Sequence, residues 1–199
     1  LLLSGNAKIQ LTWMDVKIGD WVVTPRSGKP IEIQALWLGA LAAEARLSGL
    51  MQEQPRYLEP YGKARESFST FWRKNLGEDG QITERFMDVI GLSGEPDGSL
   101  RPNAALALSL PDTPLTPEQL NALINEIETN LLTTMGLHSL SPSDPRYKGN
   151  YGGSQLQRDA AYHQGTVWPW VLTPYIELLL ARGAVRRARS ALSGLLGHV

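Results

Sequence analysis

The sequence of 199 residues contains no cysteine and only three histidines, His138, His163 and His198. Without cysteine the chain has neither structural disulfides nor thiolate chemistry. The histidines do not have the spacing of a metal site, so we expect no metal ion and no other cofactor. A chain without cysteine also fits a cytoplasmic protein, and we expect that location.

Long basic runs and long apolar runs are also missing. The 19 basic and 20 acidic residues give a net charge of −1, and no basic tract is longer than Arg186-Arg187. This balance lacks the electrostatic footprint of a nucleic-acid or anionic-membrane binder. The longest apolar stretch, residues 171–181, is interrupted by Pro174 and Glu177 and is too short to span a bilayer. We therefore expect neither nucleic acid nor a membrane as a partner.

What the chain does contain is the composition of a globular domain, with 42% hydrophobic and 20% charged residues. The opening Leu1-Leu2-Leu3 has no basic segment before it and no initiating methionine, so it does not have the pattern of a signal peptide. We expect residues 1–199 to be one partial catalytic domain, truncated at both ends of a longer protein. The remainder of that parent polypeptide would then be its partner.

The spacing of apolar residues predicts an all-α architecture with long loops. Thr116 and Pro117, for example, form a typical helix start. Extended pieces are expected near 21–23 and 86–90, with loops or short strands over 77–100. The segment 133–165 is rich in Gly, Pro, Ser and Asp and predicts a long loop of the kind that lines a site. Helices are expected over 31–50, 61–74, 117–132, 171–182 and 185–196, with a short apolar piece at 104–110.

Two loops, residues 11–26 and 158–170, hold four of the six tryptophans beside Asp, Arg, His and Gln. This mixture suits a sugar, because an indole packs against the C–H face of a pyranose while polar groups bind its hydroxyls. Tryptophans also serve as packing residues in a core. Composition alone leaves both interpretations open.

Asp15 is the carboxylate best suited to general acid catalysis. It lies beside Trp13, Met14 and Val16, and a partly apolar pocket would raise its pKa above the ordinary value of about 3.9. The alternative, that Asp15 caps a turn or pairs with Lys17, stays open. Glycoside hydrolysis usually needs a second carboxylate across the sugar ring. Spacing does not select one among Asp20, Glu32, Asp144 and Asp159.

Four segments, in the same order, resemble the C-terminal amylo-α-1,6-glucosidase domain of glycogen debranching enzymes. The first is LTWMD (11–15) followed by GDWVVTPRSGKPIEIQALW (19–37), and the second is LRPN (100–103). The third is GLHSLSP (136–142) followed by DPRYKG (144–149), and the fourth is YHQGTVWPW (162–170). The resemblance extends from about residue 5 to residue 182.

This resemblance implies an incomplete (α/α)6 toroid of the six-hairpin glycosidase type. The implied reaction is inverting hydrolysis of the α-1,6-linked glucose branch stub of glycogen or limit dextrin, so the expected partner is an α-glucan. Asp15 matches the general acid of the family. The family's general base is a glutamate beyond the last motif, and no matching segment lies in residues 1–199. We therefore expect this chain alone to be inactive.

The resemblance also suggests substrate-binding residues in the same loops. Trp13, Trp168 and Trp170 are expected to wall a pocket. Two other interpretations remain: another (α/α)6 α-glycosidase with a different linkage preference, and a non-catalytic carbohydrate-binding module. The residues expected to bind hydroxyls or to hold the loops are Arg26, Glu32, Arg101, Asn103, His163 and Gln164.

Overall fold

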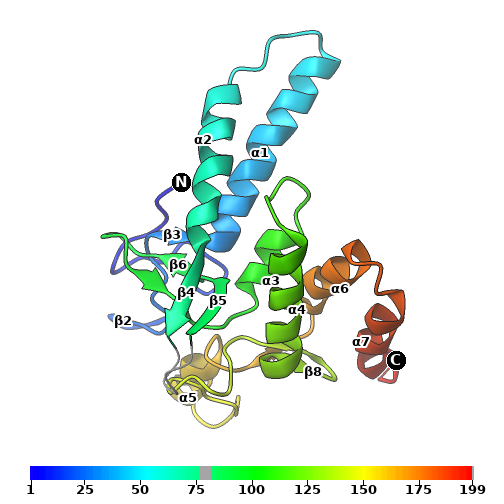
Figure 1. Ribbon diagram of the computed structural model, residues 1–199. Helices are drawn as coiled ribbons and strands as arrows, with labels where there is room; N and C mark the ends of the chain where they lie inside the picture. The colour runs from blue at the N-terminus through cyan, green and yellow to red at the C-terminus, as the bar shows by residue number, and fades with distance from the viewer. Residues whose placement is uncertain (77–81, 199) are drawn as a thin grey trace.

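Seven α-helices organise the part of the chain that the computed structural model describes, residues 1–76 and 82–198. Six of them follow one another along the chain as three consecutive pairs, and in the first and the third pair the two helices pack together. These are α1 (Ile31–Leu50) with α2 (Leu58–Phe68), α3 (Asn103–Leu108) with α4 (Pro117–Asn130), and α6 (Leu172–Ala181) with α7 (Val185–Leu196). The remaining helix, α5 (Gln155–Ala161), precedes α6 in the chain. In Figure 1 the α1–α2 hairpin projects from a body formed by the other elements.

Local sequence explains where several helices begin. At α4, Thr116 Oγ1 accepts the Gln119 N–H at 3.2 Å and Gln119 Oε1 accepts the Thr116 N–H at 3.0 Å. This capping box satisfies two amide groups that the first helical turn leaves without partners. The helices predicted at 31–50 and 185–196 have the expected bounds, and those predicted at 117–132 and 171–182 end within two residues of them.

The prediction of a helix over 61–74 was partly wrong. α2 ends at Phe68, a 3₁₀ turn covers Ser69–Phe71, and β4 (Trp72–Leu76) then pairs with β5 (Ile82–Phe86). Trp72 lies opposite Phe86, with ring centroids 4.8 Å apart. Cross-strand pairing of two aromatic side chains therefore prevails over the helical spacing that continued to Lys74. Residues 77–81 of the predicted loop lie outside the described residues.

The segment 133–165 is not one long loop, which corrects the prediction. β8 (Leu132–Thr133), β9 (Gly136–His138) and β10 (Val167–Trp168) form a three-stranded antiparallel sheet. Ser154 and Gln157 form a capping box that begins α5. The other short strands are β1 (Lys17–Ile18) paired with β2 (Trp21–Val22), and β3 (Lys29–Pro30) paired with β6 (Val89–Ile90), which also pairs with β7 (Pro96–Asp97).

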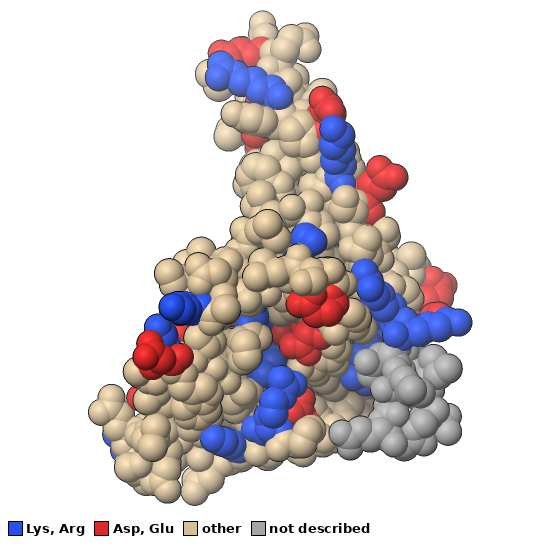
Figure 2. All heavy atoms as spheres, turned by 90° about the vertical axis from the view of Figure 1, so that its left-hand side faces the viewer, with Lys and Arg blue, Asp and Glu red and all other residues tan. Residues whose placement is uncertain are grey.

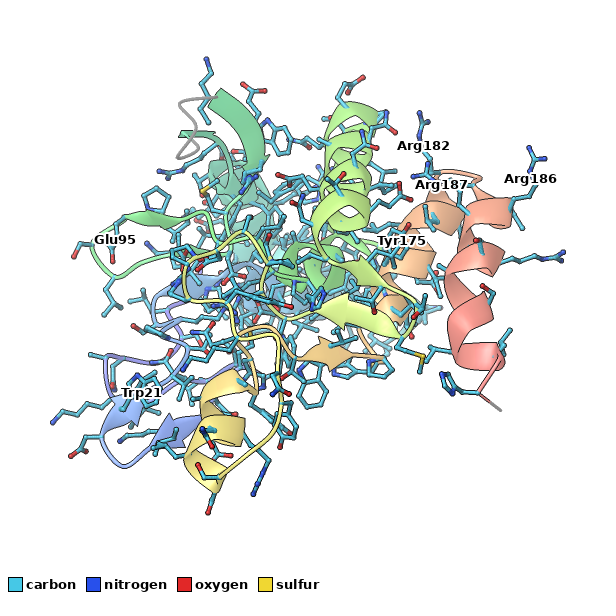
Figure 3. All side chains as sticks on the ribbon, turned by 90° about the horizontal axis from the view of Figure 1, so that it is seen from below. Trp21, Glu95, Tyr175, Arg182, Arg186 and Arg187 are labelled. Carbon is cyan, nitrogen blue, oxygen red and sulfur yellow. The ribbon has the colours of Figure 1, made fainter. Side chains whose placement is uncertain are left out.

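The core lies where α3 packs against both α1 and α6. The buried alanines of α3, among them Ala105 and Ala107, allow a close approach of the larger side chains of its neighbours. Hydrogen bonds and an ion pair join α6, α7 and the turn between them to α4. The Tyr175 hydroxyl donates to Glu128 at 2.6 Å, Arg187 forms an ion pair with the same carboxylate, and Arg182 Nε donates to Asn121 at 2.7 Å (Figure 3).

Part of the apolar surface of the helices is left uncovered. Leu36 of α1 is 56% exposed and Leu180 of α6 is 45% exposed. On the face seen in Figure 2, acidic and basic side chains are interspersed rather than gathered by sign. Within residues 1–76 and 82–198, no helix is both long enough and apolar enough to cross a membrane.

Candidate functional site

Trp13 is the residue around which most of the predicted site residues meet. Its indole Nε1 donates to Asn103 Oδ1 at 2.7 Å. Its ring lies edge-to-face with those of His163 and Trp170, with centroids 5.1 and 5.0 Å apart, and with that of Trp168 at 6.3 Å. The two tryptophan-rich loops, more than a hundred residues apart in sequence, are therefore adjacent in space.

Asp15 lies two residues beyond this centre and is exposed. No hydrogen bond or ion pair involves its carboxylate within the described parts of the chain, so neither the turn cap nor the pair with Lys17 forms there. The partly apolar pocket expected around Asp15 was wrong for these residues, because the neighbour that turns inward is Met14. Its side chain is fully buried, and its sulfur contacts Asn103 Nδ2 at 3.6 Å and Arg101 Nη1 at 3.8 Å.

Beneath the loops, Arg26 forms two bidentate ion pairs. Its Nη1 and Nη2 donate to Glu32 at 2.5 and 2.7 Å, and its Nε and Nη2 donate to Asp88 at 2.6 and 3.0 Å. Burial lowers the pKa of the Arg26 guanidinium, but the carboxylates of Asp88 and Glu32 raise it by more than burial lowers it. The net pKa is raised, so Arg26 stays protonated. All three side chains are buried, which makes this a structural centre, and Glu32 alone of the three also lines a hollow beside Trp13.

Asp88 is the residue that sequence reasoning missed. Besides the two bonds from Arg26, Asp88 Oδ1 accepts the Asn103 Nδ2–H at 2.7 Å, and its backbone carbonyl accepts the Ile31 N–H at 3.1 Å. Asp88 thus joins the start of α1, the start of α3 and the loop that holds Arg26. The signal was present in the sequence, since Asp88 is the one charged residue in the apolar run 86–90. A charge in a buried segment needs a partner.

Arg101 holds the second tryptophan-rich loop. Its Nη1 donates to the carbonyls of Ser139 at 3.0 Å and His163 at 2.6 Å, and its Nη2 donates to Gln164 Oε1 at 2.7 Å. Gln164 Nε2 in turn donates to the carbonyl of Val23 at 2.9 Å, which links the two loops directly. Burial lowers the pKa of Arg101 to about 10, while Asp88 opposes the shift.

The four buried charges balance, with Arg26 and Arg101 against Glu32 and Asp88. Such a set is tolerable inside a protein because each charge has partners, and removing one member leaves another uncompensated. Of the residues expected to bind hydroxyls or to hold loops, Arg26, Glu32, Arg101, Asn103 and Gln164 are buried and bonded to other protein groups.

His163 differs from these residues. It is 2% exposed, yet its Nδ1 has no hydrogen-bond partner among the described residues. Burial lowers its pKa to about 4, and the positive charges of Arg101 and Arg26 act in the same direction. The imidazole is therefore neutral at pH 7 and packs between the rings of Trp13 and Tyr162.

Trp13 and Trp170 form one wall of a hollow of about 380 Å³, which we call the Trp13 hollow. Helices α1, α3 and α6 and the two residues after α3 contribute the rest of its lining, which includes Glu32, Leu36, Leu106, Leu110 and the exposed Glu177. Trp168 is not part of this wall; its Nε1 donates to the Tyr162 carbonyl at 3.0 Å and it supports the loop. Among the described residues, no cluster of three His, Cys, Asp or Glu could hold a metal ion.

The fold defines the class to which the chain belongs. It matches the solved structure of the GH63 mannosylglycerate hydrolase from Thermus thermophilus in complex with Tris, with a TM-score of 0.58 and 19% identity over 84% of this chain and 36% of that one. The structure of the same hydrolase with glucose matches with a TM-score of 0.58 and 18% identity, again over 84% of this chain and over 38% of the hydrolase. The predicted fold is thereby confirmed as an incomplete toroid of the six-hairpin glycosidase type.

The family is defined by sequence. The family model described as amylo-alpha-1,6-glucosidase matches residues 1–198, and the chain belongs to this family. It is also 33% identical over 87 residues to the glycogen debranching enzyme of Saccharomyces cerevisiae (strain ATCC 204508 / S288c). That match covers 40% of this chain and 6% of the yeast enzyme, so the chain spans a small part of that relative.

Proposed function

We propose that this chain supplies the acid-bearing part of a site that hydrolyses the α-1,6-linked glucose branch stub of glycogen or limit dextrin. Asp15 acts as the general acid, and the reaction proceeds with inversion. The general base is a glutamate that residues 1–199 do not contain and that the remainder of a longer polypeptide contributes. The protein acts in the cytoplasm, which a chain free of cysteine fits.

The observation that carries this proposal is the placement of Trp13 and Asp15. The indole of Trp13 is held by Asn103 and surrounded by His163, Trp168 and Trp170. Two residues further on, the Asp15 carboxylate is exposed and free of described partners, so it is accessible to a substrate. A rigid aromatic wall and, two residues along the chain, an accessible carboxyl group are the two features that a glycosidase needs to bind a sugar and protonate its leaving oxygen.

The bond changes follow from inversion. The carboxylic acid of Asp15 gives its proton to the glycosidic oxygen as the bond from that oxygen to the glucose C1 breaks. A water molecule attacks C1 from the opposite face and loses a proton to the base carboxylate. The two carboxyl groups in inverting enzymes stand about 6.5–9.5 Å apart, which leaves room for the water.

Glucose release from a branch-stub limit dextrin tests this function. The proteins to compare are the natural full-length polypeptide that includes residues 1–199, its Asp15→Asn variant, and the 199-residue chain alone. Glucose release by the full-length protein only, with silence of the other two, is the expected result. Glucose release by the isolated chain would contradict the proposal that residues 1–199 lack the general base. Binding without release by the full-length protein would favour the carbohydrate-binding module.

A further inference from the structure

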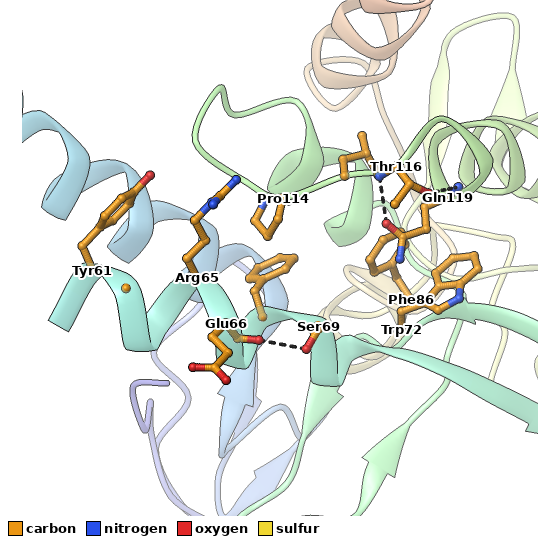
Figure 4. A pocket seen from close by; sticks show the side chains of 12 residues that line it. Tyr61, Arg65, Glu66, Ser69, Trp72, Phe86, Pro114, Thr116 and Gln119 are labelled. Carbon is orange, nitrogen blue, oxygen red and sulfur yellow. Dashed lines mark hydrogen bonds between the residues drawn. The ribbon is translucent and has the colours of Figure 1, made fainter. Parts of the chain in front are cut away.

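A second hollow, which we call the α2–α4 groove, lies between α2 and the segment that leads into α4 (Figure 4). Its volume is about 650 Å³, within the range of sites for small molecules. No described residue lines both this groove and the Trp13 hollow. The residues that matter for its chemistry are Tyr61, Arg65, Glu66, Trp72, Phe86 and Gln119.

Two aromatic side chains give the groove its recognition surface. Tyr61 and Trp72 are half-buried, so each ring retains accessible area. Phe86, only 6% exposed, packs against Trp72 with the ring centroids 4.8 Å apart and the planes at 65°. Because the indole is already held by its neighbour, little conformational freedom remains to be lost when a ligand packs on it.

Polar groups also line this groove. Arg65 and Glu66 are exposed on α2, and within residues 1–76 and 82–198 neither side chain has a hydrogen bond or an ion pair. Gln119 Oε1 is occupied by the Thr116 N–H, which orients the amide and leaves its Nε2 to donate (Figure 4). The groove therefore offers donors and an acceptor, with one positive and one negative charge in adjacent positions.

This combination selects a class of ligand. Accessible ring faces suit the C–H faces of pyranoses, while Arg, Glu and Gln are planar groups that bind pairs of hydroxyls. The adjacent opposite charges disfavour a strongly charged ligand. We propose that the α2–α4 groove binds an unreacted stretch of the α-glucan chain whose branch stub is cleaved with Asp15 as the acid. This inference rests on the proposed function for the identity of the glycan.

Binding of maltoheptaose and of glycogen, measured separately from glucose release, tests the proposal. Both measurements use the full-length polypeptide carrying Asp15→Asn, so that the glucan is not consumed. Trp72→Ala and Arg65→Ala are the test variants, and Arg65→Ala changes an exposed side chain without threatening the fold. Lys63→Ala is the matched control, because it removes a cation from α2 outside the groove.

The expected result is that each test variant weakens the binding of both glucans about tenfold, as loss of an anchoring contact does, and that Lys63→Ala binds normally. In the full-length polypeptide that keeps Asp15, the test variants should cleave a short branched oligosaccharide at the normal rate. Unchanged glucan affinity in both test variants overturns the proposal even if glucose release is normal. A loss of thermal stability in place of affinity in Arg65→Ala also overturns it, because this exposed side chain would then be covered by protein. If the test variants weaken glucan binding but the full-length protein with Asp15 releases no glucose, the groove proposal stands and only the proposed hydrolysis is contradicted.

Discussion

Asp88 determines which way the Asn103 amide faces. Its Oδ1 accepts the Asn103 Nδ2–H at 2.7 Å, which turns the amide oxygen of Asn103 toward Trp13 Nε1, also at 2.7 Å. A carboxylate has no hydrogen to donate, so the reversed amide would face Asp88 with its oxygen and Trp13 with its N–H groups. The orientation of the indole in the Trp13 hollow thus depends on a charge that acts on it through Asn103.

Replacing Asp88 by Asn should be strongly destabilising. The change leaves Glu32 as the one buried carboxylate for Arg26 and Arg101. It also allows the Asn103 amide to reverse its orientation. We expect a loss of about 3–5 kcal/mol in the free energy of unfolding, as for other broken buried pairs. Urea unfolding measures the loss. The control is Asp112→Asn, which breaks the pair between Asp112 and Arg46, whose side chain is 60% exposed. That change should cost no more than about 1 kcal/mol, and equal losses would contradict the role given to Asp88.

Asn103→Ala should leave the Trp13 N–H without its acceptor. An unsatisfied donor at this half-buried position costs about 1–3 kcal/mol, and the freed indole should change the tryptophan fluorescence. Asn121→Ala serves as the control, because Asn121 accepts a bond from the exposed Arg182. An unchanged emission spectrum in the Asn103 variant would show that Asn103 does not hold Trp13.

Stability should fall as the pH decreases from about 6.5 toward 4. The pKa of His163 is lowered to about 4 in the folded chain from an ordinary value near 6.5, so the unfolded chain binds the proton first. The stabilisation from the neutral imidazole is therefore complete above the unfolded pKa, and at most about 3 kcal/mol is lost across this window. Unfolding of the wild type and of His163→Gln between pH 7.5 and 4 measures it. The variant should show the shallower dependence on pH, and parallel curves would contradict the assignment.

Trp170→Ala should impair substrate use more than folding. Trp170 is 44% exposed in the wall of the Trp13 hollow, so its removal leaves little buried surface without contacts. We expect kcat/KM on limit dextrin to fall about tenfold, with the midpoint of thermal unfolding nearly unchanged. Trp21→Ala is matched for exposure, since Trp21 is 46% exposed outside that hollow. A similar loss of activity in both variants would argue against the wall.

Gly136→Ala should disrupt the sheet that supports the second tryptophan-rich loop. Gly136 has φ of +151°, and an added Cβ would clash with the Trp168 carbonyl group. The backbone of β10 would have to move, which we expect to cost more than about 1 kcal/mol. Gly39→Ala is the control, because no atom lies within 4 Å of its Cβ position in α1. That change should stabilise the helix by about 0.5–1 kcal/mol, and a harmless Gly136→Ala would contradict this account.

The sequence predicted the helices well where one local rule governed the element. Thr116 and Gln119 specify the start of α4. The apolar spacing in α1 predicts a helix but not its buried face, since Leu36 is 56% exposed and Gln34 is buried. The prediction failed at Trp72 because the partner of that residue, Phe86, is supplied by the next strand. It also failed for 133–165, where β9 pairs with β10 and where the local capping signal of Ser154 and Gln157 was passed over. Pairing between distant segments leaves no local period in the sequence.

The site shows the same division. Composition and resemblance predicted Trp13, Asp15 and the second loop, and they also pointed to most of the supporting centre, but not to Asp88. Arg26 and Glu32 are close in sequence, whereas Asp88 reaches them from another segment, and only the folded chain reveals that it also holds Asn103. The expectation of an enclosed Asp15 failed because alternate side chains in that segment point to opposite sides, and Met14 takes the inward position.

The most direct test of Asp15 as the general acid compares two leaving groups in the full-length polypeptide. Fluoride leaves without a proton, whereas the sugar oxygen of limit dextrin needs one. Loss of a general acid costs about 10²–10⁴-fold in rate when protonation is required. We predict that Asp15→Asn loses glucose release from limit dextrin to this extent while it still hydrolyses α-glucosyl fluoride within about tenfold of the wild-type rate. Equal losses on both substrates, or an unimpaired rate on limit dextrin, would contradict the assignment.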